Sequence, residues 1–248
     1  MTITLYKFGS LWNIADPSPF CIKLESYLRV ANVDFEAPVF EMSFFKKAPK
    51  GKLPFIKKAD GSIVGDSNLI IEELVASGEK DLDAALNVEE RSISCAFHRL
   101  LDEHFYWALV YSRWQDEPGW SIVSDMFFGD ITPFIRGLIQ NKEQKTVIGY
   151  MKGHGLGRHN REEIYSIASK NITALSDYLS DKKYFFGKDE LTFIDICLHS
   201  YIINIITPDI DNPLKEAVMA CQNLVDHALR LDAEIYGDLY KKSQSKAA

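Results

Sequence analysis

The stretch S-P-F-C-I-K, residues 18 to 23, follows shortly after the run I-T-L-Y-K-F-G, residues 3 to 9. In that run Ile3 and Leu5 alternate with other side chains, as they do in a half-buried strand. Ser18 is a favoured residue for the N-cap of a helix, and Pro19 suits the first helical position. Apolar residues then recur at helical spacing, so this part of the chain predicts a strand followed by a helix with one buried face.

The next segments add two more strand regions and a helix. F-E-A-P-V-F, residues 35–40, predicts a second strand, and Pro38 places it at a sheet edge because proline donates no ladder hydrogen bond. Residues 53–66 predict a hairpin, since Asp60-Gly61 supplies the positive φ angles of a tight turn. Asp66-Ser67 then caps a helix whose expected buried residues are Leu69, Ile70, Leu74 and Val75. This order predicts a thioredoxin-like domain over residues 1–80.

The remainder of the chain is expected to be helical over residues 87–240. Capping boxes begin at Asn87, Asn160 and Thr192, and Thr132-Pro133 forms a further helix start. The helix after Thr192 is apolar nearly all round, so it belongs in the middle of a bundle. The helix after Asn87 carries one predicted buried stripe, formed by Ile93, Phe97, Leu100, Leu101, His104, Ala108 and Tyr111.

The composition argues against several classes of protein. The chain is 46% hydrophobic and 25% charged, which is average for soluble globular proteins. Its net charge of −7 argues against binding to nucleic acid or to anionic membranes. No apolar run approaches the roughly 20 residues of a membrane span, and the amino terminus does not read as a signal peptide. The four cysteines form no C-x-x-C pair. We therefore expect reduced cytosolic thiols and no zinc site or other metal site.

Four local features in this order resemble the cytosolic glutathione transferases. They are S-P-F-C at residues 18–21, K-L-P-F at 52–55, D-S at 66–67 and L-T-F-I-D at 191–195. The resemblance implies an α/β thioredoxin-like domain that binds glutathione, followed by an all-α bundle that carries a second-substrate pocket.

Two further runs resemble one subgroup of that superfamily, which includes the metaxins and the failed-axon-connections proteins. They are C-I-K-L-E-S-Y-L-R-V-A, residues 21–31, and G-H-G-L-G-R-H, residues 153–159. The second run lacks the lysine of a phosphate loop and follows no predicted strand, so we interpret it as a connection into a helix.

The resemblance also implies where glutathione binds. The backbone of Leu53, before a cis Pro54, would pair with the cysteinyl part of the ligand. Ser67 and free backbone N–H groups at the start of the helix would bind the γ-glutamyl carboxylate, and Asp66 its ammonium group. Lys52 would bind the glycyl carboxylate. Glutathione is then the co-substrate.

Ser18 occupies the place where a glutaredoxin C-P-[YF]-C site has its attacking cysteine. A serine cannot form a mixed disulfide, but its hydroxyl can donate a hydrogen bond to a thiolate supplied by glutathione. Together with the helix N-terminus it would favour that anion by a unit or two of pKa. The alternatives are that Ser18 is only a helix cap, or that Ser10, Tyr6 or Cys21 contacts the thiol.

The functional prediction is a glutathione transferase that attacks an apolar electrophile. Tyr106, Tyr111 and Trp114 are the predicted contacts of that electrophile. The resemblance implies a cytoplasmic homodimer, and we expect no nucleic-acid or membrane partner. One alternative is a non-catalytic, metaxin-like scaffold; another is a glutathione-dependent thiol reductase that uses Cys21.

Overall fold

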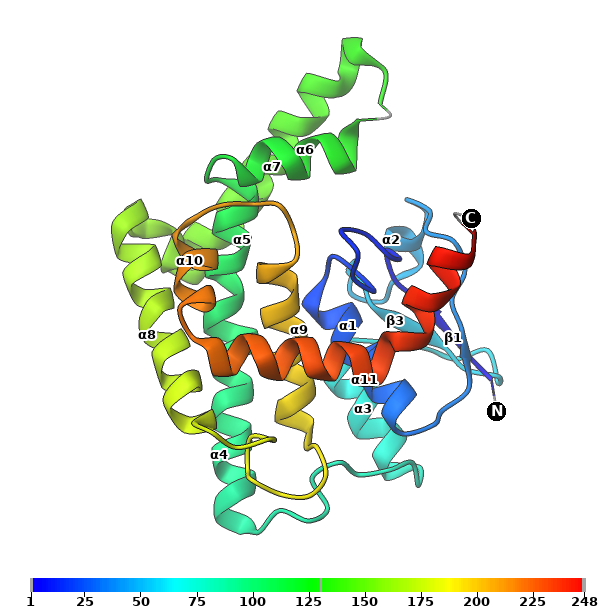
Figure 1. Cartoon of the computed structure of the whole chain (residues 1–248). Helices are drawn as coiled ribbons and strands as arrows, with labels where there is room; N and C mark the ends of the chain where they lie inside the picture. Colours follow the sequence, from blue (N-terminus) through cyan, green and yellow to red (C-terminus); the bar gives the residue numbers. More distant parts are fainter. Residues whose placement is uncertain (1, 130, 247–248) are drawn as a thin grey trace.

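The computed structural model describes the backbone of residues 2–129 and 131–246, with side chains as far as residue 237 (Figure 1). Its first part contains a four-stranded sheet in the order β2-β1-β3-β4. The strands are β1 (Ile3–Tyr6), β2 (Phe35–Glu36), β3 (Phe55–Lys57) and β4 (Ile63–Gly65). β1 runs parallel to β2 and antiparallel to β3, and β3 runs antiparallel to β4.

Helices cover both faces of this sheet. Helices α1 (Pro19–Val30) and α3 (Ser67–Ala76) pack on the face that carries Ile3 and Leu5. The short helix α2 (Phe44–Lys47) packs against the face that carries Tyr6. This arrangement confirms the predicted thioredoxin-like fold.

Two details of this region differ from the predictions. β2 ends at Glu36 instead of residue 40, because Pro38 cannot donate to a sheet ladder. Leu69, predicted to be buried, is 47% exposed, and Ile71 takes its place in the core. The helix begins at Ser67, which turns the Leu69 position toward solvent.

The rest of the described chain is helical and confirms the predicted all-α bundle. The elements after the sheet region are α4 (Val88–Arg99), η1 (Leu100–Phe105), α5 (Tyr106–Trp114), α6 (Gly119–Phe128), α7 (Pro133–His154), η2 (Leu156–Arg158), α8 (Arg161–Leu179), α9 (Phe193–Ile206), α10 (Pro213–Met219) and α11 (Gln222–Lys246). None of the described helices combines the length and the apolar character that crossing a membrane would require.

Helix α9 lies in the middle of this bundle, as its apolar sequence predicts. Every residue from Ile194 to Ile205 is buried, and Figure 1 shows α11 crossing α9. The predicted capping box opens α9, and Oδ2 of Asp195 accepts the backbone N–H of Thr192 at 2.8 Å. By contrast, α6 and the first half of α7 project from the rest of the molecule (Figure 1).

The long helix after Asn87 is interrupted by the π-helical segment η1. A π turn holds more residues than an α turn, so it shifts the buried face around the helix. His104, predicted to lie in the buried stripe, is consequently exposed, and its Nδ1 lies 2.8 Å from Nδ2 of Asn171. Asp102, which the pattern did not single out, is buried instead.

Candidate functional site

Ser18 is the N-cap residue of α1, with Pro19 in the first turn. Its backbone N–H donates to Oδ1 of Asp16 at 2.9 Å. Its side chain is half-buried and makes no capping hydrogen bond with the helix. The predicted helix start is confirmed, and the Ser18 hydroxyl is not used as the cap.

Cys21 lies in the first turn of α1 and is fully buried. Burial raises the pKa of its thiol well above the usual value, and the charge of Asp16 adds to this effect. A hydrogen bond with the Ser18 side chain acts in the opposite direction. A protonated thiol without access to solvent is a poor nucleophile. The geometry therefore argues against a thiol reductase that attacks through Cys21.

Tyr6 and Ser10, the two other residues with a candidate hydroxyl group, are held by different kinds of contact. The ring of Tyr6 stacks on Phe55 at 4.3 Å and packs edge-on against Phe44 at 4.9 Å. The Ser10 hydroxyl donates to the carbonyl of Ile14 at 2.8 Å. Of these three residues, Ser18 is the one at the amino end of α1.

Asp16 is a fully buried carboxyl group at the turn that precedes α1. Its two oxygens accept the backbone N–H groups of Ser18 and Gly9, each at 2.9 Å. Burial raises the pKa of Asp16 to about 7, and the charge of Glu25 adds to the rise. The positive charge of Lys7 and the two N–H bonds act in the opposite direction.

Because Asp16 is buried, we expect its titration to lower the free energy of unfolding as the pH rises from about 4 to about 7. The pKa of Asp16 is about 7 in the folded chain and 3.8 in a model compound, so in this window the folded state keeps a proton that the unfolded chain has lost. The free energy of unfolding should fall by about 1.4 kcal/mol per pH unit through this group.

Urea unfolding of the wild type and of Asp16→Asn, each measured at pH 5 and at pH 7, tests this expectation. Asparagine does not titrate, so the wild type should lose more stability than Asp16→Asn between the two values. Parallel pH profiles of the two proteins would contradict it.

The peptide bond between Leu53 and Pro54 is cis, at the position that the resemblance indicated. Leu53 itself is buried just before β3. The preceding Lys52 is exposed, and its ammonium nitrogen lies 5.3 Å from the ring centroid of Tyr150 on α7. Lys52 thus lies beside the helical part of the chain, and its role toward a ligand stays a prediction.

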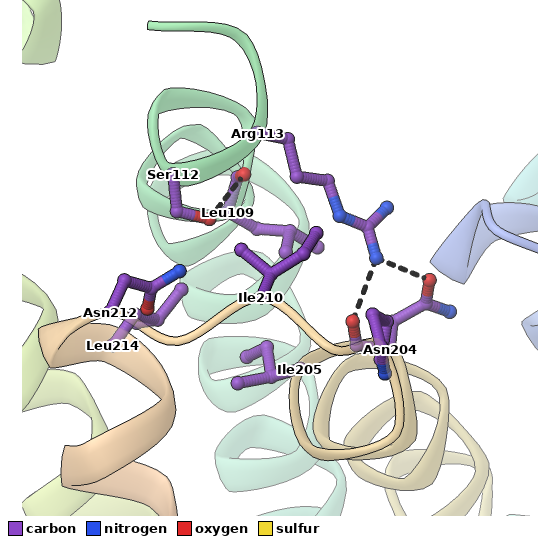
Figure 2. Close-up of a pocket in the computed structure, with 9 residues that line it drawn as sticks. Leu109, Ser112, Arg113, Asn204, Ile205, Ile210, Asn212 and Leu214 are labelled. Carbon is purple, nitrogen blue, oxygen red and sulfur yellow. Dashed lines mark hydrogen bonds between the residues drawn. The ribbon is translucent and has the colours of Figure 1, made fainter. Parts of the chain in front are cut away.

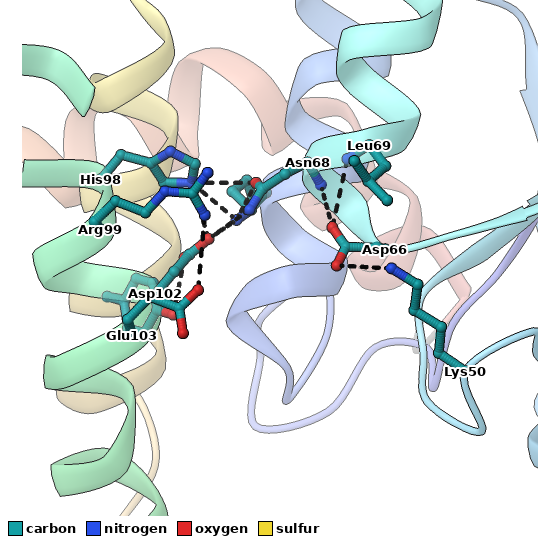
Figure 3. Close-up of polar contacts among 10 residues, drawn as sticks. Lys50, Asp66, Asn68, Leu69, His98, Arg99, Asp102 and Glu103 are labelled. Carbon is teal, nitrogen blue, oxygen red and sulfur yellow. Dashed lines mark hydrogen bonds and ion pairs between the residues drawn. The ribbon is translucent and has the colours of Figure 1, made fainter. Parts of the chain in front are cut away.

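Asp66 and Ser67 form the start of α3. Asp66 has a φ of +87° and is the N-cap, and its Oδ1 accepts the backbone N–H groups of Asn68 and Leu69 at 3.0 and 3.4 Å. Those two N–H groups are therefore not free for a ligand, which corrects the expectation from sequence. Lys50 lies 3.5 Å from the other oxygen of Asp66 (Figure 3).

Ser67 is buried at the first position of α3. Its own backbone N–H and hydroxyl are the groups at this helix start that Asp66 does not occupy. The groups at this helix start that the helix itself leaves for the predicted γ-glutamyl contact are therefore those of Ser67 and Oδ2 of Asp66, which lies 3.5 Å from Lys50.

A buried polar cluster joins the sheet region to the helical bundle at Asn68, the residue after Ser67. Asp102 lies at its centre, and its Oδ2 is 2.8 Å from Nε2 of His98 and accepts the Asn68 amide at 3.0 Å (Figure 3). The same oxygen accepts the Lys23 ammonium group from α1 at 2.5 Å. The second oxygen of Asp102 accepts the Tyr201 hydroxyl at 3.1 Å. Desolvation alone would raise the pKa of Asp102, but the His98 hydrogen bond and the Lys23 charge outweigh it and hold the pKa well below its usual range.

The sequence did not reveal this cluster. A lysine and an aspartate 79 positions apart have no local pattern that pairs them. The sequence contained one hint of it, because Lys23 is a charged residue among the mostly apolar residues at the start of α1.

The three residues predicted to contact the electrophile lie in different surroundings. Tyr111 is only 6% exposed and packs edge-on against Tyr165 in the helical core, so it does not line a substrate pocket. Trp114 is half-buried in an aromatic group with Trp120 and Phe127.

Tyr106 is the predicted contact nearest to the start of α1. Its ring is half-buried and packs edge-on against Phe20 at 4.9 Å. Burial raises the pKa of Tyr106, the charge of Arg113 lowers it, and Cys21 raises it. Of the three aromatic residues, Tyr106 is therefore the one that the fold brings to the Ser18 turn.

The histidines of the G-H-G-L-G-R-H run do not come together. His154 stacks on Trp107 at 5.0 Å, whereas His159 lies 3.3 Å from Glu163. Among the described residues, no group of three or more histidine, cysteine or acidic side chains is arranged to hold a metal ion. The run does connect α7 to α8 through η2, as interpreted from the sequence.

Two family models match the chain. The glutathione S-transferase N-terminal domain matches residues 19–119, and the glutathione S-transferase C-terminal domain matches residues 168–231. Among solved structures, a β-etherase from Sphingobium sp. strain SYK-6 superimposes with a TM-score of 0.65 and 19% identity, over 98% of this chain and all of that one. That likeness shows the fold.

The chain also has curated relatives. Isoprene-epoxide–glutathione S-transferase of Rhodococcus sp. (strain AD45) is 34% identical, over 92% of this chain and 97% of the relative. Failed axon connections of Drosophila melanogaster is 31% identical over 95% of this chain but only 58% of its own length. Metaxin-1 of Homo sapiens is 26% identical over 80% of this chain and 43% of its own length. With its fold, its two domain matches and these relatives, the chain belongs to the glutathione S-transferase family.

Proposed function

We propose that the chain is a glutathione transferase that binds glutathione beside Ser18 and directs its thiolate at an apolar electrophile. The observation that carries this proposal is the Ser18 hydroxyl. It lies half-buried at the amino end of α1, and the helix does not use it as a cap. At that position an anion can accept a hydrogen bond from the Ser18 O–H and is also stabilised by the positive end of the α1 dipole.

In the proposed reaction the protein stabilises the sulfur anion and holds the two reactants together. A free thiol titrates near pKa 8.5 and is mostly protonated at neutral pH. The Ser18 O–H donates a hydrogen bond to the sulfur, which lowers the pKa of the bound thiol, so a larger fraction of the bound glutathione is present as the thiolate. The thiolate then forms a carbon–sulfur bond, and the electron pair of the bond that breaks goes to the leaving group.

Three segments of the chain would hold glutathione. The backbone of Leu53 pairs with the cysteinyl residue, Ser67 and Asp66 hold the γ-glutamyl group, and Lys52 meets the glycyl carboxylate. Asp66 presents one oxygen to Lys50 at 3.5 Å, an exposed contact that a ligand ammonium group is able to replace.

The electrophile is proposed to lie against Tyr106 and the aromatic group of Trp114. The name of the Rhodococcus relative supports including small epoxides among the substrates. With an epoxide, the electron pair of the broken carbon–oxygen bond stays on the former ring oxygen, which then takes up a proton. The cytoplasmic location and the homodimer predicted from the resemblance remain parts of this proposal.

Calorimetric titration with reduced glutathione tests the site. We expect saturable binding to the wild type and a loss of affinity of about 10- to 100-fold in Ser67→Ala, because a hydrogen bond to a charged group contributes about 1.5–3 kcal/mol. Ser62→Ala is the matched control, since the Ser62 hydroxyl bonds to Asp60 in the exposed hairpin turn. Absence of binding to the wild type at millimolar glutathione would rule out the transferase.

A non-catalytic scaffold is the alternative, and one structural observation favours it. On the projecting part of α7, Phe134 is 91% and Leu138 72% exposed, and such a patch suits contact with another protein. The chain is also similar to metaxin and failed-axon-connections proteins, the subgroup whose resemblance first suggested this alternative. The glutathione titration separates the two functions, because the scaffold needs no ligand.

A further inference from the structure

Arg113, in the last turn of α5, is a buried cation that the proposed reaction leaves unused. It is 9% exposed. Its Nη1 donates to the carbonyl of Pro17 at 2.6 Å. Its Nη2 donates to the carbonyl and to Oδ1 of Asn204 at 2.7 and 2.9 Å (Figure 2). All three acceptors are neutral oxygens. No carboxylate among the described residues makes an ion pair with Arg113, although Asp16 acts on its charge through space.

The surroundings keep this cation out of water. The ring of Trp12 lies 5.0 Å from the guanidinium carbon, and Trp12 is held there by a turn in which it and Asn13 have φ values of +52° and +58°. The adjoining cavity has a volume of about 10 Å³, which is room for about one water molecule and too little for a substrate. Burial lowers the pKa of Arg113 to about 10, so it stays charged at neutral pH.

The hydrogen bonds of Arg113 reach the residue directly before Ser18. Pro17 is held by Arg113, and the carbonyl of Asp16 accepts Nδ2 of Asn204 at 3.4 Å. The helical bundle thus fixes the two peptide groups that lead into the Ser18 N-cap. An unpaired cation at this turn also favours any negative charge that binds there, because Coulomb attraction is strong where water is excluded.

We propose that Arg113 is a positioning residue for Ser18. Arg113 sets the position of the Ser18 hydroxyl and supplies a positive potential that favours the glutathione thiolate. This inference rests on the proposed function and assigns a second group to the same site. Arg113 acts through Pro17 and through space, without touching the ligand. Its titratable neighbours are Tyr106 and Asp16.

The test follows the ultraviolet absorbance of the thiolate of bound glutathione against pH. In Arg113→Met the pH midpoint of thiol ionisation in bound glutathione should rise by about one unit relative to the wild type. Below the wild-type midpoint glutathione binds as the thiol, so the affinity measured there should change by less than about threefold, because the ligand loses no direct contact. Arg99→Met removes the same charge from an exposed position on α4 and should leave the midpoint unchanged.

A second variant keeps Arg113 but pairs its positive charge with a new carboxylate. Asn204→Asp places a carboxylate where the amide oxygen now accepts from Arg113 at 2.9 Å, and it should raise the midpoint in the same direction. This variant decides the matter if Arg113→Met does not fold. Arg113→Lys keeps the charge but has no fork to bridge Pro17 and Asn204, so we expect a partial rescue.

The outcomes separate this inference from the function on which it rests. If the wild type binds no glutathione, both fail. If the wild type binds glutathione with a lowered thiol midpoint, and the midpoint is unchanged in both Arg113→Met and Asn204→Asp, the role of Arg113 alone is disproved.

Discussion

Asp102→Asn is expected to lower the free energy of unfolding by about 3–5 kcal/mol, because it leaves the Lys23 cation buried without its partner. Lys23 is fully buried and lies 2.5 Å from Asp102. Asparagine has nearly the same volume as aspartate, so the change removes the charge and little packing. Urea unfolding of both proteins at neutral pH measures the loss.

The neighbouring residue on the same segment supplies the control. Glu103 is exposed and makes a surface pair with Arg99 at 3.6 Å (Figure 3), so Glu103→Ala should change stability by less than about 0.5 kcal/mol. Adding Lys23→Met to Asp102→Asn removes the unpaired cation and should recover part of the loss. Equal stabilities of Asp102→Asn and Glu103→Ala would show that the buried pair contributes nothing.

The second large effect is expected from Ser18→Ala. Loss of the O–H donor should raise the pKa of the bound thiol by about one to two units, the value of one charge-assisted hydrogen bond. Turnover of glutathione with chlorodinitrobenzene should therefore fall by about 10- to 100-fold at pH 6.5 and recover as the pH rises. Stopped-flow thiolate absorbance and steady-state rates across pH measure both quantities.

The same variant distinguishes a catalytic hydroxyl from a helix cap. The Ser18 side chain makes no capping bond, so its removal should leave the unfolding free energy nearly unchanged, whereas loss of a true cap costs about 1 kcal/mol. Ser10→Ala should leave the thiol pKa as it is, because that hydroxyl is bonded to Ile14. A destabilised Ser18→Ala with a normal thiol pKa would identify Ser18 as a cap only.

Much of the fold was predictable because its signals are local. The strand Ile3–Tyr6, the helix start at Ser18-Pro19, the N-cap at Asp66 and the box formed by Thr192 and Asp195 all occur where the sequence predicts them. These signals depend on side-chain alternation, on capping hydrogen bonds or, at Ser18-Pro19, on the fixed φ of proline, all within four residues, which the order of amino acids specifies directly.

The candidate site was only partly predictable, because its electrostatics depend on distant partners. The family resemblance predicted Ser18 and Ser67 as ligand contacts, but the sequence could not show that Asp66 accepts hydrogen bonds from two N–H groups of α3. It also placed Tyr111 in a pocket when that ring lies in the core. The π-helical segment shifted the buried face of the long helix, and no residue pattern in that stretch predicted the shift.

The sequence by itself therefore determined the order of the strands and of helices α1 and α3 in the sheet region, the capping boxes at Asn87, Asn160 and Thr192, and the family of the chain. The tertiary structure decided which charges meet: Lys23 with Asp102, 79 positions away, and Arg113 with the carbonyl of Pro17, 96 positions away. The physical reason is that a cap or an apolar stripe depends on neighbours along the chain. The state of a buried charge depends instead on every dipole and ion that packing brings within a few ångströms.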